Sequence, residues 1–210
     1  MPTETMTAHR YLWVKDDPVG MEHAAIGIGA DGLVATSTAF GTLPIAYRLD
    51  LELHADADWI TRRLALTASG DGWTRSLVLS RAGSWTGAIT DDGIVPPAVV
   101  ASATGDGIDP GDVPPDVLDV DVQYSPLTNL MPIRRLGLDR PGAAGSFVMA
   151  WISVPSLAIT LDDQRYTLLG IDDGDRCARF ENGDGFFIAV IRCDADGVVV
   201  DYPGIARRLS

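Results

Sequence analysis

Hydrophobic and polar residues alternate in short stretches along most of this chain. The clearest stretch covers residues 47–54, where four hydrophobic residues alternate with polar ones: Tyr47, Leu49, Leu51 and Leu53. Successive side chains on a strand point to opposite faces of a sheet, so a period of two predicts a strand with one buried face. Further strands are expected at residues 11–16, 23–30, 33–40, 60–67, 74–81, 85–90, 117–123, 133–138, 146–154, 157–169, 176–181, 186–193 and 197–202.

The segments between these stretches are rich in residues that form tight turns. Ala-Asp-Gly, Ser-Gly-Asp-Gly, Asn-Gly-Asp-Gly and Asp-Ala-Asp-Gly each separate two predicted strands, as in β-hairpins. The best helical turn is residues 125–128, where Ser125 is a candidate N-cap and Pro126 the first helical residue. We therefore expect an all-β fold with a large antiparallel sheet and few short helical turns, in a single domain covering residues 1–210.

Two parts of the chain resemble each other, at about residues 44–103 and 117–171. Residues 62–64 and residues 134–136 both read Arg-Arg-Leu, and similar strand-like segments follow each of them. A duplication predicts two halves that form one extended antiparallel sheet, curled like a barrel around a shared interior. Chance similarity is the alternative, because β patterning recurs often.

Composition narrows the choice of partners. The chain of 210 residues has a formal net charge of −13 and a pI near 4.4, whereas nucleic acids and anionic membranes bind clustered basic residues. No apolar stretch approaches the roughly 20 residues of a membrane-spanning helix, and no signal peptide is evident. We expect a cytoplasmic monomer or dimer without nucleic-acid partners or an integral membrane segment, with Cys177 and Cys193 as reduced core thiols.

The sequence contains partial motifs for cofactors and metals, but the flanking residues that these motifs require are missing. Residues 27–32 match the dinucleotide fingerprint Gly-x-Gly-x-x-Gly, but a β-like stretch follows where a helix should begin. Residues 194–197 match part of a calcium loop, yet Arg192 and Pro203 stand where acidic ligands should be. The three histidines have no zinc spacing, and no nucleophile elbow is found. The sequence predicts no cofactor and no metal.

The segment of residues 117–138 combines acids with paired arginines. Asp119 and Asp121 share one face of a predicted strand, and Arg134 and Arg135 are adjacent, so only one of the two arginines faces inward if they lie on a strand. A solvated acidic face is the simpler interpretation, since most charges lie outside. The nearby arginines favour an ion pair lining a cavity, because a buried guanidinium needs a carboxylate or an anionic ligand.

The same segment resembles a known family. Asp119-Val-Asp121, Ser125-Pro-Leu-Thr-Asn129 and Pro132-Ile-Arg-Arg-Leu136 are similar to the signature of the bacterial putative glycolipid-binding family, formerly of unknown function. Flanking features agree from about Trp13 to Arg208, namely Gly20-x-Glu22, Tyr47, Trp59-x-x-Arg62, Trp85, Val154-Pro155, Gln164-Arg-Tyr166-Thr167 and Asp201-Tyr202-Pro203. The resemblance implies a curved, barrel-like antiparallel sheet that encloses an apolar cavity, likened to the carriers of bacterial lipoproteins.

These features together favour a non-enzymatic carrier of an amphipathic lipid or glycolipid. An apolar cavity would take the acyl chain, at about 0.8 kcal/mol per buried methylene, and a polar cluster would hold the head group. Core packing is the simpler role of the five tryptophans, although one or two are candidates for a platform under a sugar ring or a lipid chain. The candidate ligand-binding residues are Glu22, Arg62, Asp121, Asn129, Arg134, Arg135, Tyr166, Trp13 and Trp59.

Two other functions stay open. An enzyme of lipid or isoprenoid metabolism would use Glu22 or Asp121 as acid or base and an arginine to stabilise negative charge, in a small pocket where carboxylate and arginine converge. No nucleophile–base pair or metal constellation accompanies these residues. Alternatively, the charged cluster only ties the fold together, and Arg135→Ala would then lower stability without changing ligand affinity.

Overall fold

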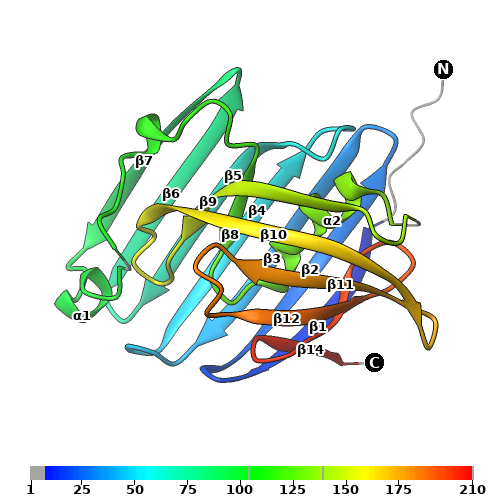
Figure 1. The fold of residues 1–210 in the computed structure, drawn as a ribbon. Helices are drawn as coiled ribbons and strands as arrows, with labels where there is room; N and C mark the ends of the chain where they lie inside the picture. The colour runs from blue at the N-terminus through cyan, green and yellow to red at the C-terminus, as the bar shows by residue number, and fades with distance from the viewer. Residues whose placement is uncertain (1–7, 104, 139, 210) are drawn as a thin grey trace.

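Fourteen β-strands form one continuous sheet in the part of the chain that this computed structural model describes, residues 8–103, 105–138 and 140–209 (Figure 1). The strands are β1 (Ala8–Asp16), β2 (Val19–Gly29), β3 (Gly32–Gly41), β4 (Tyr47–Ala55), β5 (Thr61–Gly70), β6 (Trp73–Ala82), β7 (Ser84–Gly93), β8 (Asp119–Val122), β9 (Ala144–Ile152), β10 (Ile159–Asp172), β11 (Asp175–Asn182), β12 (Ile188–Cys193), β13 (Val199–Tyr202) and β14 (Ala206–Leu209). The all-β class predicted from the alternating pattern is confirmed.

Hairpin connections account for most of the strand order, which is β7-β6-β5-β4-β3-β2-β1-β14-β13-β12-β11-β10-β9-β8. The strands β1–β7 form one antiparallel meander, the strands β9–β14 form another, and the two meanders join where β1 pairs with β14. The exception is β8, which pairs parallel with β9. The sheet curves without closing, so that β8–β10 lie across the face of the first meander (Figure 1).

In the described part of the chain, four short helices interrupt the strands: α1 (Pro97–Val100), η1 (Pro110–Asp112), η2 (Pro126–Asn129) and α2 (Leu130–Leu136). The helical turn predicted at Pro126 is present, although Ser125 makes no capping hydrogen bond. The strand predicted at residues 133–138 is wrong, since these residues lie largely in α2. Its Arg-Arg pair breaks the alternation, whereas Leu130 and Ile133 are spaced for one face of a helix and are both buried. Within the described ranges, no helix is long and apolar enough to cross a membrane.

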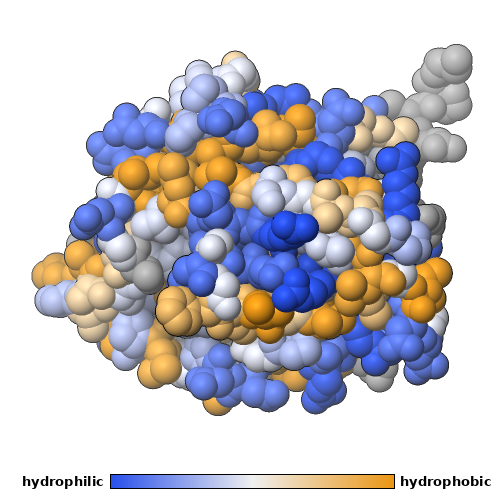
Figure 2. Space-filling view, viewed as in Figure 1, coloured by the Kyte–Doolittle hydropathy of each residue, from blue (hydrophilic) through white to orange (hydrophobic). Residues whose placement is uncertain are grey.

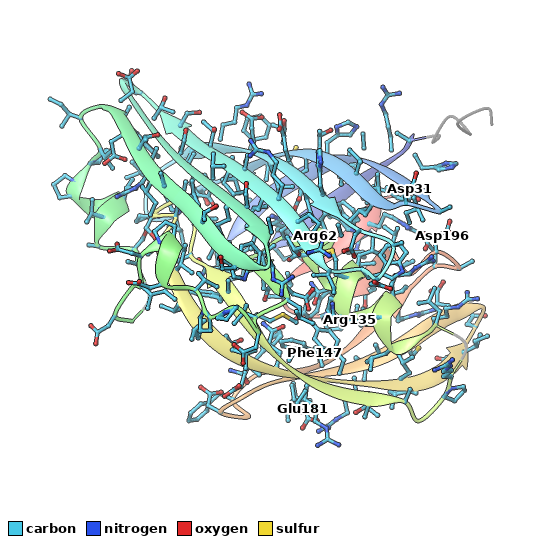
Figure 3. All side chains as sticks on the ribbon, turned by 90° about the horizontal axis from the view of Figure 1, so that it is seen from above. Asp31, Arg62, Arg135, Phe147, Glu181 and Asp196 are labelled. Carbon is cyan, nitrogen blue, oxygen red and sulfur yellow. The ribbon has the colours of Figure 1, made fainter. Side chains whose placement is uncertain are left out.

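The helices η2 and α2 lie between the two halves of the curved sheet (Figure 3) and occupy much of the space there. Every residue from Pro126 to Ile133 is buried. Leu127 and Met131 pack mainly with residues of β1–β7, whereas Ile133 packs with a second core cluster on β9–β13. The chain itself therefore fills much of the interior that the resemblance implied as an apolar cavity.

Two smaller expectations have different outcomes. Cys177 and Cys193 are buried and free, as predicted. The duplication of residues 44–103 and 117–171 stays a prediction. Its two Arg-Arg-Leu segments differ in local structure, because the first lies on β5 and the second in α2.

Trp13 ties together the seam between the two meanders. It is fully buried, and its indole Nε1 donates to the backbone oxygen of Val199 on β13 at 2.9 Å. Trp13→Phe keeps an aromatic ring but leaves that buried carbonyl without this donor, which costs about 1–3 kcal/mol. We expect urea unfolding to report a loss of that size; an unchanged unfolding midpoint would contradict this role.

Candidate functional site

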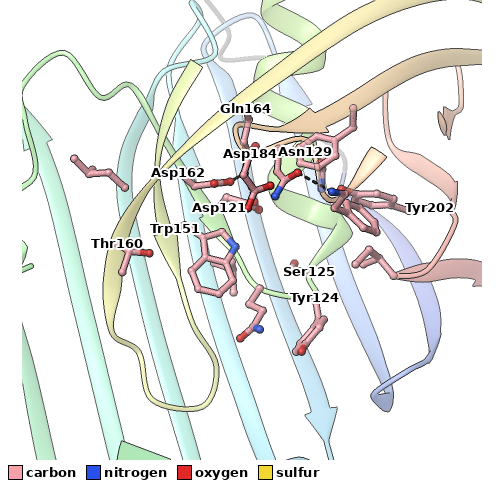
Figure 4. Close-up of a pocket in the computed structure, with 17 residues that line it drawn as sticks. Asp121, Tyr124, Ser125, Asn129, Trp151, Thr160, Asp162, Gln164, Asp184 and Tyr202 are labelled. Atoms are coloured by element: carbon pink, nitrogen blue, oxygen red, sulfur yellow. Dashed lines mark hydrogen bonds between the residues drawn. The ribbon is translucent and has the colours of Figure 1, made fainter. Parts of the chain in front are cut away.

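A pocket of about 380 Å³ lies at one end of the sheet (Figure 4). Four segments that are distant in sequence line it: residues 121–125 at the end of β8, the beginning of β10, the β11–β12 turn and the β13–β14 turn. The topology brings these segments together. Strands β8 and β9 both run toward this end, β10 starts from it, and both hairpin turns lie there.

The polar part of the pocket is organised around the side-chain amide of Gln164, which is only 2% exposed. Its Nε2 donates to Asp121 Oδ2 at 2.7 Å and to Asp162 Oδ2 at 3.0 Å. Its Oε1 and Asn129 Oδ1 lie 3.1 and 2.9 Å from the hydroxyl oxygen of Tyr166 and share its single proton as acceptors. Tyr166 therefore fixes the orientation of Gln164, and Gln164 in turn fixes both carboxylates.

The pocket is electrostatically unusual because acids gather in it without bases. Burial raises the pKa of Asp121, although hydrogen bonds from Gln164 and Thr128 oppose the rise. Burial also raises the pKa of Asp162, and the nearby Asp184 and Asp163 raise it further. None of the described residues that line the pocket is lysine, arginine or histidine. The site thus presents hydrogen-bond acceptors and negative charge.

Aromatic rings form the apolar part of the pocket. Phe180, Phe187 and Tyr202 pack against one another with ring centroids 5.9–6.0 Å apart. In Figure 4, Trp151 stands on one side of the acidic group and Tyr202 on the other. A flat ligand with polar edges would meet rings at its faces and acceptors at its rim.

A second polar cluster holds the pocket wall in place from behind. Glu22, which is 1% exposed, accepts hydrogen bonds from the hydroxyls of Ser37 (2.8 Å) and Ser125 (2.9 Å), and Lys15 Nζ lies 3.4 Å from its other oxygen. Ser125 follows Tyr124, a lining residue with a φ of 65°. A tyrosine in this left-handed conformation persists only where its surroundings hold it. Glu22 therefore positions the wall and does not line the pocket.

Arg135 pairs with a carboxylate outside the pocket lining. Its Nη1 donates to Asp119 Oδ1 and to the backbone oxygen of Trp59, both at 3.0 Å, and its Nη2 contacts the other oxygen of Asp119. The guanidinium also lies 4.9 Å from the centre of the Phe147 ring. Asp119 is 1% exposed, so a solvated acidic face is the wrong interpretation for this residue. An ion pair with a nearby arginine is present, but neither residue lines the pocket, so the expected position of the pair at a cavity is not found here.

Arg134 and Arg62 also lie away from the pocket. The guanidinium of Arg134 covers the ring of Trp59 at 4.2 Å and donates to the backbone oxygen of Asp196. Arg62 forms a partly exposed ion pair with Asp56. Arg62 is at the start of β5, and Arg134 and Arg135 contact the β12–β13 and β4–β5 loops, all at the end of the sheet from which β5 runs toward the pocket end. Figure 3 shows Arg62 and Arg135 between the two halves of the sheet. Arg134 therefore fastens α2 to two neighbouring loops, whereas Arg62 links β5 to the β4–β5 loop.

The structure brings only part of the predicted site together. Asp121 and Asn129 line the pocket, and Tyr166 and Glu22 support its lining residues. The remaining predicted residues lie elsewhere: Arg62, Arg134, Arg135, Trp13 and Trp59.

The sequence did not predict several of the residues that line the pocket. Gln164 and Tyr202 lie in two of the flanking motifs, but nothing in those motifs marks them as pocket residues. Asp184 belongs to an Asn-Gly-Asp-Gly turn, which indicated only a hairpin, and Trp151 looked like the other tryptophans. Their convergence depends on strand order, which local patterning does not encode.

Comparison with known proteins identifies one family and one similar crystal structure. The model of a family described as "Putative glycolipid-binding" matches residues 10–208. A DUF1089 family protein (PA1994) from Pseudomonas aeruginosa, solved at 1.80 Å, has 30% sequence identity and a TM-score of 0.66. The similarity covers 90% of this chain and 92% of that protein. A comparison with curated proteins finds no match.

Replacing Arg135 tests its bracing role. Arg135→Ala would leave the carboxylate of Asp119 buried and unpaired, and breaking a buried ion pair costs about 3–5 kcal/mol. We expect the free energy of unfolding to fall by that amount in chemical denaturation, with ligand affinity at the pocket unchanged. Arg62→Ala is the matched control, because its exposed pair contributes about 0–1 kcal/mol. Equal losses in the two variants would contradict this role.

Asp121 gives the protein a specific pH dependence. Because burial raises the pKa of Asp121, its ionised form destabilises the fold, and wild-type stability falls as the pH rises through the raised pKa. We expect Asp121→Asn to melt at a higher temperature than wild type near pH 7, with the difference vanishing toward about pH 4. Thermal unfolding across this range measures it. Asp58→Asn, at an exposed carboxylate, should show no such trend; a variant less stable than wild type at neutral pH would refute the argument.

Proposed function

Because this chain belongs to the putative glycolipid-binding family, we propose that its pocket binds the carbohydrate head group of a glycolipid. The observation that carries the proposal is the composition of the lining, which combines carboxylate and amide acceptors with aromatic rings and, among the residues that the structure describes, includes no basic one. Sugar hydroxyls are donors, and ionised carboxylates only accept, so the two are complementary. The proposed function is binding, without a chemical reaction.

The charge of the pocket limits which kinds of head group it can bind. Asp121, Asp162 and Asp184 would repel a phosphate or carboxylate on the ligand, because no arginine or lysine among the described lining residues offsets them. An uncharged sugar, or one that carries an amine, meets no such repulsion. This replaces the expectation that Arg134 or Arg135 grips the head group.

The size of the pocket limits how much of the lipid it holds. Pockets for small ligands span about 300–1,000 Å³, and this one, at about 380 Å³, is near the lower limit. With η2 and α2 filling the neighbouring interior, the volume suits a head group more than a whole lipid. The enzyme alternative loses support here, because it required an arginine to converge with the carboxylate.

The test compares neighbouring carboxylates on one strand. Asp162 lines the pocket, whereas Asp163 is exposed, as expected for adjacent residues on a strand. Asp162→Ala should weaken binding of octyl glucoside about tenfold to a hundredfold, since a hydrogen bond to a charged group contributes about 1.5–3 kcal/mol. Asp163→Ala should bind like wild type, with both variants measured by calorimetry below the micelle concentration.

Octyl phosphate serves as the counter-ligand, because it keeps the alkyl chain and replaces the sugar by an anion. We expect no measurable binding to the wild type. Tighter binding of octyl phosphate than of octyl glucoside, or equal effects of the two substitutions, would overturn the proposed function.

A further inference from the structure

Large hydrophobic side chains are unusually exposed at the end of the sheet that holds the pocket. Phe186, in the β11–β12 turn, is 91% exposed, and Ile94, just after β7, is 86% exposed. Val19 at the β1–β2 turn and Leu43 in the β3–β4 loop are 64% and 59% exposed. Residues in such connections and at strand ends are normally polar when exposed. Here two loop residues (Phe186 and Leu43), the first residue of β2 (Val19) and the residue after β7 (Ile94) each place an apolar side chain in water.

Strand direction puts these four residues at one end. The pairing of Gly20 with Gly41 places the β1–β2 turn beside the β3–β4 loop, and the hydroxyl of Thr42 donates to the backbone oxygen of Val19. The β11–β12 turn lies at the same end, since β11 runs toward it. In Figure 1 this end is at the lower left, with α1; in Figure 2 hydrophobic residues lie among hydrophilic ones along this margin, as they also do elsewhere on this face.

The pocket shares these turns. Asp184 and Phe187 line the pocket and flank the exposed Phe186, so one short turn contributes both to the polar site and to the apolar surface. Ile205, in the β13–β14 turn at this end, also lines the pocket. A surface in contact with Phe186 would therefore lie against the rim of the pocket.

The turns at the opposite end have a different character. Asp31, Asp58, Asp173 and Asp196 occupy them, and Figure 3 shows Asp31 and Asp196 together at that end. Among the described residues, none of the large exposed hydrophobic side chains lies in these four turns. Ile171, near the end of β10, is 65% exposed at this opposite end and provides a matched reference.

We propose that the pocket end of the sheet docks onto an uncharged or zwitterionic lipid bilayer, with Phe186, Val19, Leu43 and Ile94 inserted into its interface. This rests on the proposed function, because a pocket that holds only the head group leaves the acyl chains needing an apolar environment. A bilayer supplies that environment while the head group enters the pocket. Apolar tips on separate turns suit insertion as single side chains, whereas a protein partner would favour one continuous patch.

The charges at this end select the kind of bilayer. Asp16, Asp17 and Asp184 are exposed beside the apolar tips. Anionic lipids would repel these carboxylates. Proteins that bind anionic membranes do so through clustered basic residues, and the described turns at this end contain no such cluster. Binding should therefore be stronger on phosphatidylcholine vesicles than on vesicles rich in phosphatidylglycerol.

Vesicle flotation tests the proposal with the full chain. Wild type should float with phosphatidylcholine vesicles that contain a monoglucosyl diacylglycerol. Phe186→Ser should reduce the partition coefficient about tenfold or more, since burying a large apolar side chain contributes about 1.5–3 kcal/mol. Leu43→Ser should act in the same direction. Ile171→Ser, at the opposite end, should float like wild type, and melting curves verify that all three variants are folded.

The outcomes separate docking from head-group binding. If wild type binds octyl glucoside but does not float, or if Ile171→Ser and Phe186→Ser lose flotation equally, the docking proposal fails and the proposed function stands. If octyl glucoside does not bind, the proposed function fails, and the docking proposal that rests on it fails too. A change of oligomeric state in Phe186→Ser, measured by light scattering, would assign this end to contact between copies of the chain and overturn docking.

Discussion

The structure depends on covering the concave face of a very wide sheet. The fourteen-strand sheet of the described residues curves without closing and so presents an apolar inner face, and within the same residues no separate layer of helices covers it. The segment of residues 117–138 meets this need by running through the curve as β8, η2 and α2. Its consecutive buried residues from Pro126 to Ile133 connect the two core clusters. Both the fold and the pocket follow from where this segment lies.

The same segment carries two buried carboxylates with opposite roles. Asp119 is neutralised by Arg135, an arginine on the helix that follows it, and this pair fixes α2 against Trp59. Asp121, two residues later on the same face of β8, accepts hydrogen bonds from the amide of Gln164 and the hydroxyl of Thr128. Burial raises the pKa of both carboxyls, and the opposing groups are charged at Asp119 but uncharged at Asp121. A charge without a counter-charge costs stability and leaves acceptor capacity for a ligand. The contrast separates a structural brace from the proposed binding site within one short strand.

Supporting residues give the pocket its shape. Tyr166 orients Gln164, Gln164 holds Asp121 and Asp162, and Glu22 holds Ser125 next to the constrained Tyr124. Such support keeps the acceptors in place before any ligand arrives, which lowers the entropic cost of binding. The polar pocket and the exposed apolar residues beside it are the two features on which the proposed head-group binding at a lipid surface rests.

The sequence by itself determined the fold class, the hairpins and the family. Period-two alternation and turn clusters are local signals, and they gave most strands and the helical turn at Pro126. The pattern of residues 133–138 predicted a strand, but these residues lie largely in a helix. The sequence also indicated the two arginines there as ligand-binding residues, whereas both lie away from the pocket. Only the tertiary structure decided which charge meets which partner, because Asp119 and Asp121 look alike in a strand pattern. Their difference arises from strand order and curvature, which place Arg135 beside one carboxylate and Gln164, from a distant strand, beside the other.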